Sequence, residues 1–340
     1  MINKYLGVKG IRNNAGNKQL WFLKGVLVSL LFALCIGCSV GSANGGLGTP
    51  GTKIITKSLQ HGGVERTYHI HLPPGFDKNK PAPLVLALHG GGGKGTKFNE
   101  LTAEGTLEKA ADERGVVIVY PEGINRQWND GRNDIFRRGK PKDDVGFISK
   151  LIDKMAAEYG IDRKRVYSTG ISNGGFMSVR LALELSEKIT AVAPVTAQLS
   201  VAIKDKKPKL PISIMVLNGT EDPLVPYDGG HVRLFRFGRS RGEILSTAET
   251  IDRFRRHNDC SDLPEKKKLN DLDPNDGTTV EVEKYKCEKD ATEVVLVKVI
   301  GGGHTWPGGK QYLSSRLVGT VSRDINASEM ILDFFLKHSR

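Results

Sequence analysis

Compact apolar runs that alternate with helical segments constrain the fold of this chain more than any other feature. The runs are rich in β-branched residues and stop at turn residues, a pattern typical of buried parallel strands. They cover residues 83–89, 116–120, 165–169, 212–217 and 294–300. Apolar residues at helical spacing cover 101–114, 144–159, 174–186, 246–257 and 328–338. This alternation predicts an α/β fold built on a mostly parallel, doubly wound sheet.

Two further segments have weaker patterns. Residues 53–59 and 65–72 are separated by a turn at Gly62-Gly63, and we expect them to pair as an antiparallel hairpin at the edge of the sheet. Residues 261–293 are polar and rich in turn residues, so we expect a surface excursion there.

The composition excludes several classes of protein. Hydrophobic residues make up 39% and charged residues 26% of the 340 residues, so the chain can bury a core. No central stretch of about 20 apolar residues occurs, which excludes a polytopic membrane protein. The net charge of +12 comes partly from the N-terminus, and no nucleic-acid-binding motif accompanies it. We therefore expect no nucleic-acid partner.

The first 37 residues have the pattern of an export signal. Their cations precede an apolar run of about a dozen residues, and they contain no acidic residue. The run ends at Gly37-Cys38, which is similar to a bacterial lipoprotein cleavage site, so Cys38 is a candidate for lipid attachment. Cleavage nearby with release of a soluble protein is the alternative. Residues 38–52 are small and glycine-rich, as in a flexible tether, and we expect an extracellular, periplasmic or envelope-anchored protein.

Export makes the remaining cysteines interpretable. Only Cys260 and Cys287 follow the cleavage site and tether. A single pair in an oxidising compartment is most simply one disulfide, worth roughly 3 kcal/mol in the chain-entropy model. A cysteine nucleophile or a metal site is the alternative.

The third apolar run ends in a motif that presents a serine. Residues 170–174 read Gly-Ile-Ser-Asn-Gly, a G-x-S-x-G motif between a predicted strand and a predicted helix. Glycines on both sides allow a sharp turn that exposes the hydroxyl of Ser172 at the start of the helix. Ser172 is therefore a candidate nucleophile, and a helix N-cap is the alternative.

The first apolar run ends in a glycine-rich turn, His89-Gly-Gly-Gly-Gly93. Such a turn leaves backbone N–H groups free to approach an anionic oxygen. In hydrolases with a G-x-S-x-G turn, one oxyanion donor comes from this loop and one from the residue after the serine. This predicts the N–H groups of Gly91 and Asn173 as donors. A phosphate-binding loop is the alternative, but Lys94 is followed by Gly95, so a Walker motif fails.

An acidic residue and then a histidine follow the last two runs. Asp222 lies just past residues 212–217, and His304 lies just past residues 294–300. The order serine, acid, histidine is that of α/β-hydrolases, in which the acid orients the histidine that removes the serine proton. Glu221 and Asp228 compete for the acid role, and Asp222 is favoured because Pro223 turns the chain there.

These motifs together carry a family resemblance. HGGGG, GISNGG, GTEDPLVP and GGGHTWPG resemble the secreted poly(3-hydroxybutyrate) depolymerase and feruloyl esterase group of α/β-hydrolases over about residues 52–340. The resemblance implies Ser172, Asp222 and His304 as the triad, and Gly91 with Asn173 as the oxyanion hole. It also implies that Trp128 and Trp306 lie near the substrate and that Cys260 and Cys287 form a disulfide.

The sequence thus predicts an exported serine esterase whose residues 53–340 form one α/β-hydrolase catalytic domain. Its expected substrates are carboxylic esters such as hydroxyalkanoate oligomers, feruloyl esters or acetyl esters, cleaved through an acyl-enzyme without a metal or organic cofactor. Two alternatives stay open: a peptidase or acyltransferase that uses the same triad, and a catalytically silent binding protein of the cell surface.

Overall fold

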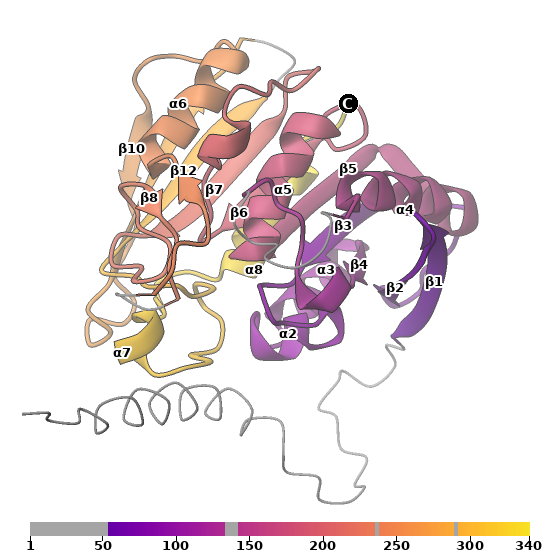
Figure 1. The fold of residues 1–340 in the computed structure, drawn as a ribbon, viewed down its shortest axis with the longest axis horizontal. Coiled ribbons are helices and arrows are strands. Elements are labelled where there is room, and N and C mark those ends of the chain that lie inside the picture. Colours follow the sequence, from indigo (N-terminus) through magenta and orange to yellow (C-terminus); the bar gives the residue numbers. More distant parts are fainter. Residues whose placement is uncertain (1–53, 133–141, 235–237, 289–291) are drawn as a thin grey trace, which may run out of the picture. The chain divides into compact units, whose positions relative to one another are not determined.

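The centre of the fold is a mixed sheet, which has ten strands within the described residues (Figure 1). The strand order is β1-β2-β4-β3-β5-β6-β7-β12-β11-β10. The strands from β4 to β12 in this order pair in parallel, whereas antiparallel pairs lie at both edges. The predicted mostly parallel sheet is therefore confirmed. The bounds are β1 Ile55–His61, β2 Val64–His71, β3 Ala82–Leu88, β4 Val117–Pro121, β5 Ile161–Ile171, β6 Ala191–Val195, β7 Ser213–Gly219, β10 Glu265–Lys268, β11 Thr279–Lys286 and β12 Glu293–Ile300.

The computed structural model describes residues 54–132, 142–234, 238–288 and 292–340. These residues all fall within one compact unit, Gly48–Arg340. The predicted signal peptide, the predicted tether and Cys38 lie outside the described residues. Two short strands, β8 Gly230–His231 and β9 Glu243–Ile244, form a separate antiparallel pair.

Helices cover both faces of the sheet (Figure 1). Apolar side chains of α4, α5 and α6 pack on one face, and those of α3 and α8 pack on the other. This two-sided cover explains why the central strands are apolar on both faces. The helix bounds are α2 Phe98–Leu101, α3 Thr106–Arg114, α4 Asp144–Tyr159, α5 Asn173–Glu184, α6 Thr247–His257, α7 Ser315–Val318 and α8 Ala327–Leu336.

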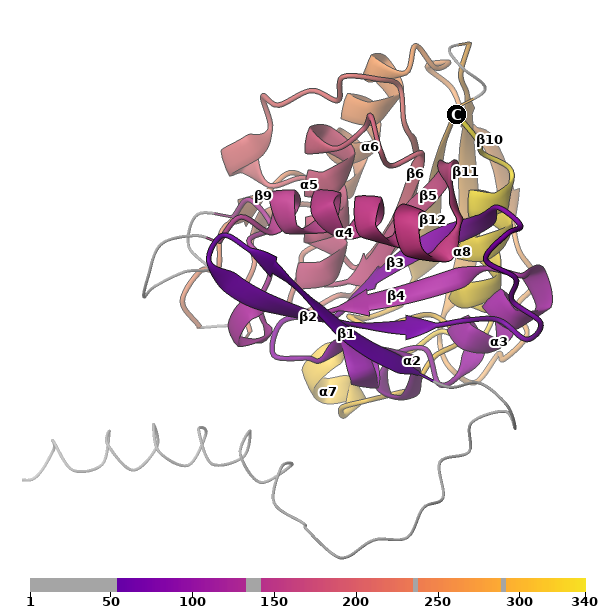
Figure 2. The ribbon, with the colours of Figure 1, turned by 90° about the vertical axis from the view of Figure 1, so that its right-hand side faces the viewer.

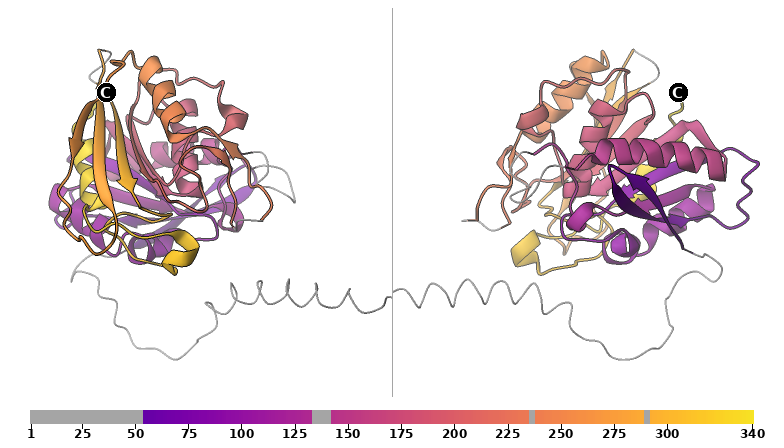
Figure 3. Two further views of the ribbon diagram at one scale, coloured as in Figure 1. Left: turned by 90° about the vertical axis from the view of Figure 1, so that its left-hand side faces the viewer. Right: turned by 45° about the vertical axis from the view of Figure 1, so that its right-hand side comes forward.

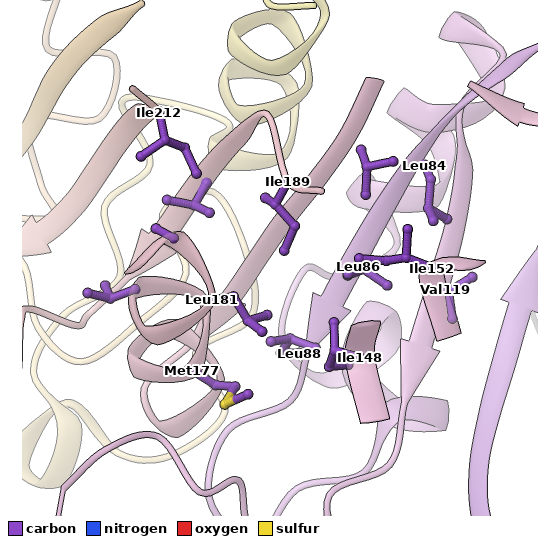
Figure 4. Packing of buried hydrophobic residues seen from close by; sticks show 14 of the residues in the cluster. Leu84, Leu86, Leu88, Val119, Ile148, Ile152, Met177, Leu181, Ile189 and Ile212 are labelled. Atoms are coloured by element: carbon purple, nitrogen blue, oxygen red, sulfur yellow. The ribbon is translucent and has the colours of Figure 1, made fainter. Parts of the chain in front are cut away.

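The larger core lies between the sheet and the helices α4 to α6. Figure 4 shows Leu84, Leu86 and Leu88 of β3 alongside Ile148 of α4 and Leu181 of α5. All five side chains are fully buried. Burial of one such side chain contributes about 1.5–3 kcal/mol, so this layer fixes the strand ends that carry the site.

The two edges of the sheet differ in character. The β1–β2 hairpin forms one edge and runs close to α4, as Figure 2 shows. This hairpin confirms the antiparallel pair expected from residues 53–72. The strands β12, β11 and β10 lead to the other edge, drawn from orange to yellow in the left view of Figure 3. All four residues of β10 are exposed.

Three segments differ from the sequence-based expectation. The helix expected over 101–114 is two helices, because Glu104 and Gly105 both take a positive φ that interrupts the helical geometry. The excursion expected over 261–293 contains β10 and β11, which extend the sheet. Strand β6 was not predicted, and it fills the place between β5 and β7.

Candidate active site

Ser172 is a one-residue turn between β5 and α5. Its backbone has φ 55° and ψ −121°, a strained conformation for a residue with a side chain. A Cβ atom at Gly174 would collide with the carbonyl oxygen of Leu88 in the neighbouring strand β3. Glycine is therefore required beside the serine, and the close packing of β3 against α5 holds the turn in place.

The hydroxyl of Ser172 is not hydrogen-bonded within the described residues, although its backbone is. Its backbone N–H donates to Val195 O at 2.9 Å and to Thr196 Oγ1 at 3.2 Å, which secures the turn. The hydroxyl makes no hydrogen bond to another described residue, and it does not cap α5. Ser172 is also partly exposed. The structure therefore gives no support to the N-cap alternative and leaves Oγ open to a substrate.

Asp222 and His304 form a buried pair. Asp222 follows β7 and His304 follows β12, and these two strands are neighbours. Asp222 Oδ2 lies 2.7 Å from His304 Nδ1, and both side chains are at most 5% exposed. Asp222 Oδ1 accepts hydrogen bonds from the N–H groups of Leu224 and Val225, at 2.8 and 2.9 Å. Both carboxylate oxygens are therefore held, and the imidazole is oriented.

The competing acids lie outside this pair. Glu221 and Asp228 are exposed, and neither side chain bonds to His304 within the described residues. The backbone N–H of Glu221 donates to Gly302 O at 2.9 Å, which ties the acid loop to the histidine loop. The position of Asp222 is thus fixed by the turn of the chain after it and by this hydrogen bond between the two loops.

The loop after His304 folds back on the histidine. The backbone N–H of His304 donates to Val318 O at the end of α7, and that of Gly303 donates to Thr320 O. Tyr312 Oη donates to His304 O at 2.8 Å. Burial raises the pKa of Tyr312, so its hydroxyl stays protonated and can donate this hydrogen bond. These bonds hold the backbone of His304, while its ring Nε2 makes no hydrogen bond to any described residue.

No hydrogen bond joins Ser172 Oγ to His304 Nε2 in the described part of the chain. Only β6 and β7 separate the strands that carry the two residues, and both residues follow carboxyl ends of parallel strands. Catalytic hydrogen bonds are commonly looser without a ligand. The acid–histidine half of the predicted triad is therefore assembled, and the serine is presented separately.

The two predicted oxyanion donors are neighbours. A Cβ atom built on Gly91 would lie 3.6 Å from Asn173 Cβ. Neither backbone N–H donates to another residue that the structure describes. Gly91 is exposed, and Asn173 begins α5, where the helix dipole favours negative charge. The pair therefore offers two free donors next to Ser172.

The side chain of Asn173 anchors the loop over residues 122–132. Its Oδ1 accepts from Trp128 N at 2.8 Å, and its Nδ2 donates to Trp128 O at 3.0 Å and to Asp130 Oδ2 at 2.6 Å. Arg132 Nη2 donates to the same Asp130 oxygen at 2.6 Å, and both side chains are buried. Sequence reasoning missed Asp130 and Arg132, because no motif links them to the serine turn.

The glycine-rich turn is held by His89. Its Nδ1 donates to Gly90 O at 2.8 Å, and its Nε2 accepts from Gly123 N at 3.0 Å. Burial lowers the pKa of His89, so the imidazole stays neutral in the one tautomer that satisfies both bonds. This histidine thus fixes the turn that carries Gly91.

The two tryptophans expected near the substrate are buried. Trp128 is 0% exposed and Trp306 is 1% exposed. Trp128 Nε1 donates to His89 O at 3.0 Å, and Trp306 Nε1 donates to Ser328 Oγ at 3.1 Å. Both rings are closed to solvent in this structure, and the bonds of Trp128 place it in support of the glycine-rich turn. Their expected place near the substrate stays a prediction.

Cys260 and Cys287 are joined by a disulfide, as the sequence predicts. The bond links the segment after α6 to the end of β11. Within the described ranges, no group of three or more histidine, cysteine or acidic side chains is arranged to hold a metal ion. No helix among those residues is long and apolar enough to span a membrane.

One cavity lies away from these residues. It has a volume of about 410 Å³ and is lined by residues of α6 and of the 204–208 loop. None of the predicted catalytic, oxyanion or substrate-binding residues lines it. A separate small cluster of buried apolar side chains contains Phe176, Ala197 and Val225.

Comparisons with known proteins show the family to which the chain belongs. Residues 60–223 match a family model described as "Putative esterase". The "Putative esterase NocK" of Nocardia uniformis subsp. tsuyamanensis is 32% identical over 279 residues, covering 81% of this chain and 80% of the relative. "Feruloyl esterase B" of Piromyces equi is 27% identical over 248 residues, covering 71% of this chain but only 43% of the relative.

A solved structure is similar to most of the described fold. The "Acetyl xylan esterase from Aspergillus awamori" covers 83% of this chain and 98% of its own, with a TM-score of 0.53 and 13% identity. At this identity the likeness concerns the fold, which is the α/β-hydrolase fold expected from the sequence motifs.

Proposed function

We propose a serine-esterase mechanism for this chain, which belongs to the "Putative esterase" family of α/β-hydrolases and is a carboxylic ester hydrolase. Ser172 is the proposed nucleophile, His304 the general base and Asp222 the acid that orients it. The observation that carries the proposal is the uncommitted Ser172 hydroxyl on a strained turn, in a chain whose buried Asp222–His304 pair keeps Nε2 free.

The proposed reaction has two steps. His304 Nε2 takes the proton of Ser172 as Oγ attacks the ester carbonyl, and the N–H groups of Gly91 and Asn173 stabilise the oxyanion. The protonated histidine then gives its proton to the leaving alcohol, which leaves an acyl-enzyme on Ser172. Water activated by the same histidine releases the carboxylic acid and restores the serine.

The proposed substrates are acetyl esters, feruloyl esters or hydroxyalkanoate oligomers. The first two are supported by the names of relatives and of a structural neighbour, which are feruloyl and acetylxylan esterases. Hydroxyalkanoate esters rest on the sequence motifs alone. The chain spans less than half the length of Feruloyl esterase B, so the activity of that whole protein carries over only as a proposal.

Hydrolysis of an ester panel tests the function. The panel contains p-nitrophenyl acetate, methyl ferulate and a 3-hydroxybutyrate dimer, each assayed with wild type and Ser172→Ala. We expect wild-type turnover of at least one ester and a loss of about 10³-fold or more in the variant, with an unchanged Tm. Retention of wild-type turnover by Ser172→Ala would show that the nucleophile assignment is wrong.

We also propose that the protein is exported and that Cys38 carries a lipid. The support is the cationic and apolar pattern of residues 1–37, together with the Cys260–Cys287 disulfide, because disulfides persist in oxidising compartments. Fractionation of bacterial cells that express the full chain should place it in the membrane fraction. Cys38→Ala should block lipid attachment and shift the protein out of that fraction. Recovery of wild type from the cytoplasm with both mature-chain cysteines reduced would contradict export.

A further inference from the structure

The side chain of Gln127 lies against the glycine-rich turn. A Cβ atom built on Gly91 would lie 3.1 Å from Gln127 Oε1 and 3.3 Å from Gln127 Nε2. The same Cβ position is 3.6 Å from Asn173 Cβ. The amide group of Gln127 thus borders Gly91, one of the two predicted oxyanion donors, on the side where Asn173 also lies.

The side-chain amide of Gln127 has no hydrogen-bond partner among the described residues, although its backbone is hydrogen-bonded. Gln127 is half-buried, and its side chain makes no hydrogen bond to another residue in the described ranges. Its backbone N–H donates to Ile124 O at 3.1 Å, and the next residue, Trp128, is bonded on both sides by Asn173. An amide that is partly removed from water gains from a partner, since an unpaired polar group is costly.

The neighbouring loop fixes the distance between Gln127 and the turn. Gly92 N donates to Arg126 O at 2.8 Å, which joins the two loops directly beside Gln127. Arg66 Nη2 donates to Glu122 O at 3.2 Å, and Asp144 Oδ2 accepts from Asn129 N at 2.7 Å. These anchors on both sides of Gln127 make its place next to Gly91 a property of the loop rather than of one flexible side chain.

We propose that Gln127 Nε2 donates a third hydrogen bond to the oxyanion formed when Ser172 attacks an ester. This inference rests on the proposed function, because it requires acyl transfer at Ser172. Nε2 is the only donor of the side chain, so the amide turns Nε2 toward the charge and Oε1 away from it. A side-chain amide can serve as an oxyanion donor alongside backbone N–H groups.

The test compares Gln127→Met with Gln60→Met, the same substitution at an exposed glutamine in β1. Loss of one oxyanion donor lowers kcat by about 10²-fold or more with little change in KM. We expect this loss for both p-nitrophenyl acetate and methyl ferulate, since the oxyanion is common to all esters. Gln60→Met should keep wild-type kcat and Tm.

A second variant keeps the test decisive if Gln127→Met folds poorly. Gln127→Glu has nearly the same shape but replaces the donor with a carboxylate, and we expect a larger loss of kcat than in Gln127→Met. A phosphonate that mimics the tetrahedral intermediate should bind both variants more weakly, in proportion to their loss of kcat/KM.

Two results would overturn the inference. One is a kcat within twofold of wild type in folded Gln127→Met or Gln127→Glu, and the other is a loss confined to one acyl group. Both require an active wild type, so they differ from failure of the proposed function, in which wild type shows no turnover that depends on Ser172.

Discussion

Two buried histidines in this molecule contact a carboxylate at the same distance but in different surroundings. His304 Nδ1 lies 2.7 Å from Asp222 Oδ2, and His71 Nε2 lies 2.7 Å from Asp112 Oδ1. The first pair follows two neighbouring parallel strands, whereas the second joins the end of β2 to α3. A short contact between a histidine and an acid therefore does not distinguish a catalytic pair from a structural one.

The second ring nitrogen makes the difference. His304 Nε2 makes no hydrogen bond to a described residue, and its chain presents a serine on the same set of strand ends. His71 Nδ1 also makes no hydrogen bond to a described residue, but it faces a second carboxylate, Glu108 Oε2, at 3.6 Å, and the His71 side chain is 0% exposed. Acids surround His71 on both sides, so it can bind α3 to the sheet but has no nucleophile to activate.

Matched Asp→Asn substitutions should separate the two pairs most strongly. Asp222→Asn should lower kcat by about 10³–10⁴-fold, because an amide no longer holds His304 in the tautomer that accepts the serine proton. Asp112→Asn should leave kcat within twofold of wild type and lower Tm by a few degrees. Ester turnover and thermal unfolding of both variants provide the measurement.

Equal losses of kcat in the two variants would contradict the distinction. Such a result would mean either that the His71–Asp112 pair affects the active site or that Asp222 only supports the fold. Circular dichroism of Asp222→Asn is the control, since the comparison of turnover requires both variants to be folded.

Removal of His71 should cost stability rather than activity. His71→Leu leaves Asp112 and Glu108 without their buried partner, and breaking a buried pair costs on the order of 3 kcal/mol. Urea unfolding should show this loss, while kcat of the folded fraction stays at the wild-type level. His71→Gln, which keeps a donor near the Nε2 position, should recover part of the stability. A lower kcat without a change in stability would refute the structural role.

The smallest effect concerns the pH dependence of stability at Glu108. Burial raises the pKa of Glu108 above its ordinary value of 4.5, against the opposing charge of His71. The folded state therefore holds this proton more tightly than the unfolded state does. The stabilising contribution is full below about pH 4.5 and is lost as pH rises through the raised pKa.

Glu108→Gln removes this titration and so isolates it. We expect the free energy of unfolding of wild type to fall relative to that of the variant as pH rises from about 4 to 7. Urea unfolding at several pH values measures the difference between the two curves. A constant difference across that range would show that Glu108 does not titrate differently in the folded state.

Much of the fold follows from the sequence because the central strands are apolar on both faces. The residues of β3, for example, are buried without exception, and their apolar run marks the strand within one residue. Strand β6 lacks such a signal, since its five residues, Ala-Val-Ala-Pro-Val, are small and include a proline. Strand β11 alternates buried valines with charged residues, and its charged residues made the segment look like a polar surface loop in the sequence.

The site is predictable where chemistry coincides with a strand end. Ser172, Asp222 and His304 each follow a strand closely, and the turn glycines mark the positions. Gln127 and Asp130 were missed because their contacts with Gly91 and Asn173 join segments more than 30 residues apart, and no spacing rule connects them. The burial of Trp128 could not be predicted either, because a tryptophan in a loop can face the core as easily as a ligand.

The four-residue strand β10 decides how the sheet ends. Its sequence, Glu-Lys-Lys-Lys, places charged side chains along the open backbone edge beyond β11. An uncharged edge would present unpaired N–H and C=O groups as a template for a strand of another molecule. Repulsion between the charges on two approaching copies disfavours such edge-to-edge pairing, so a short charged strand is a suitable way to end a large sheet.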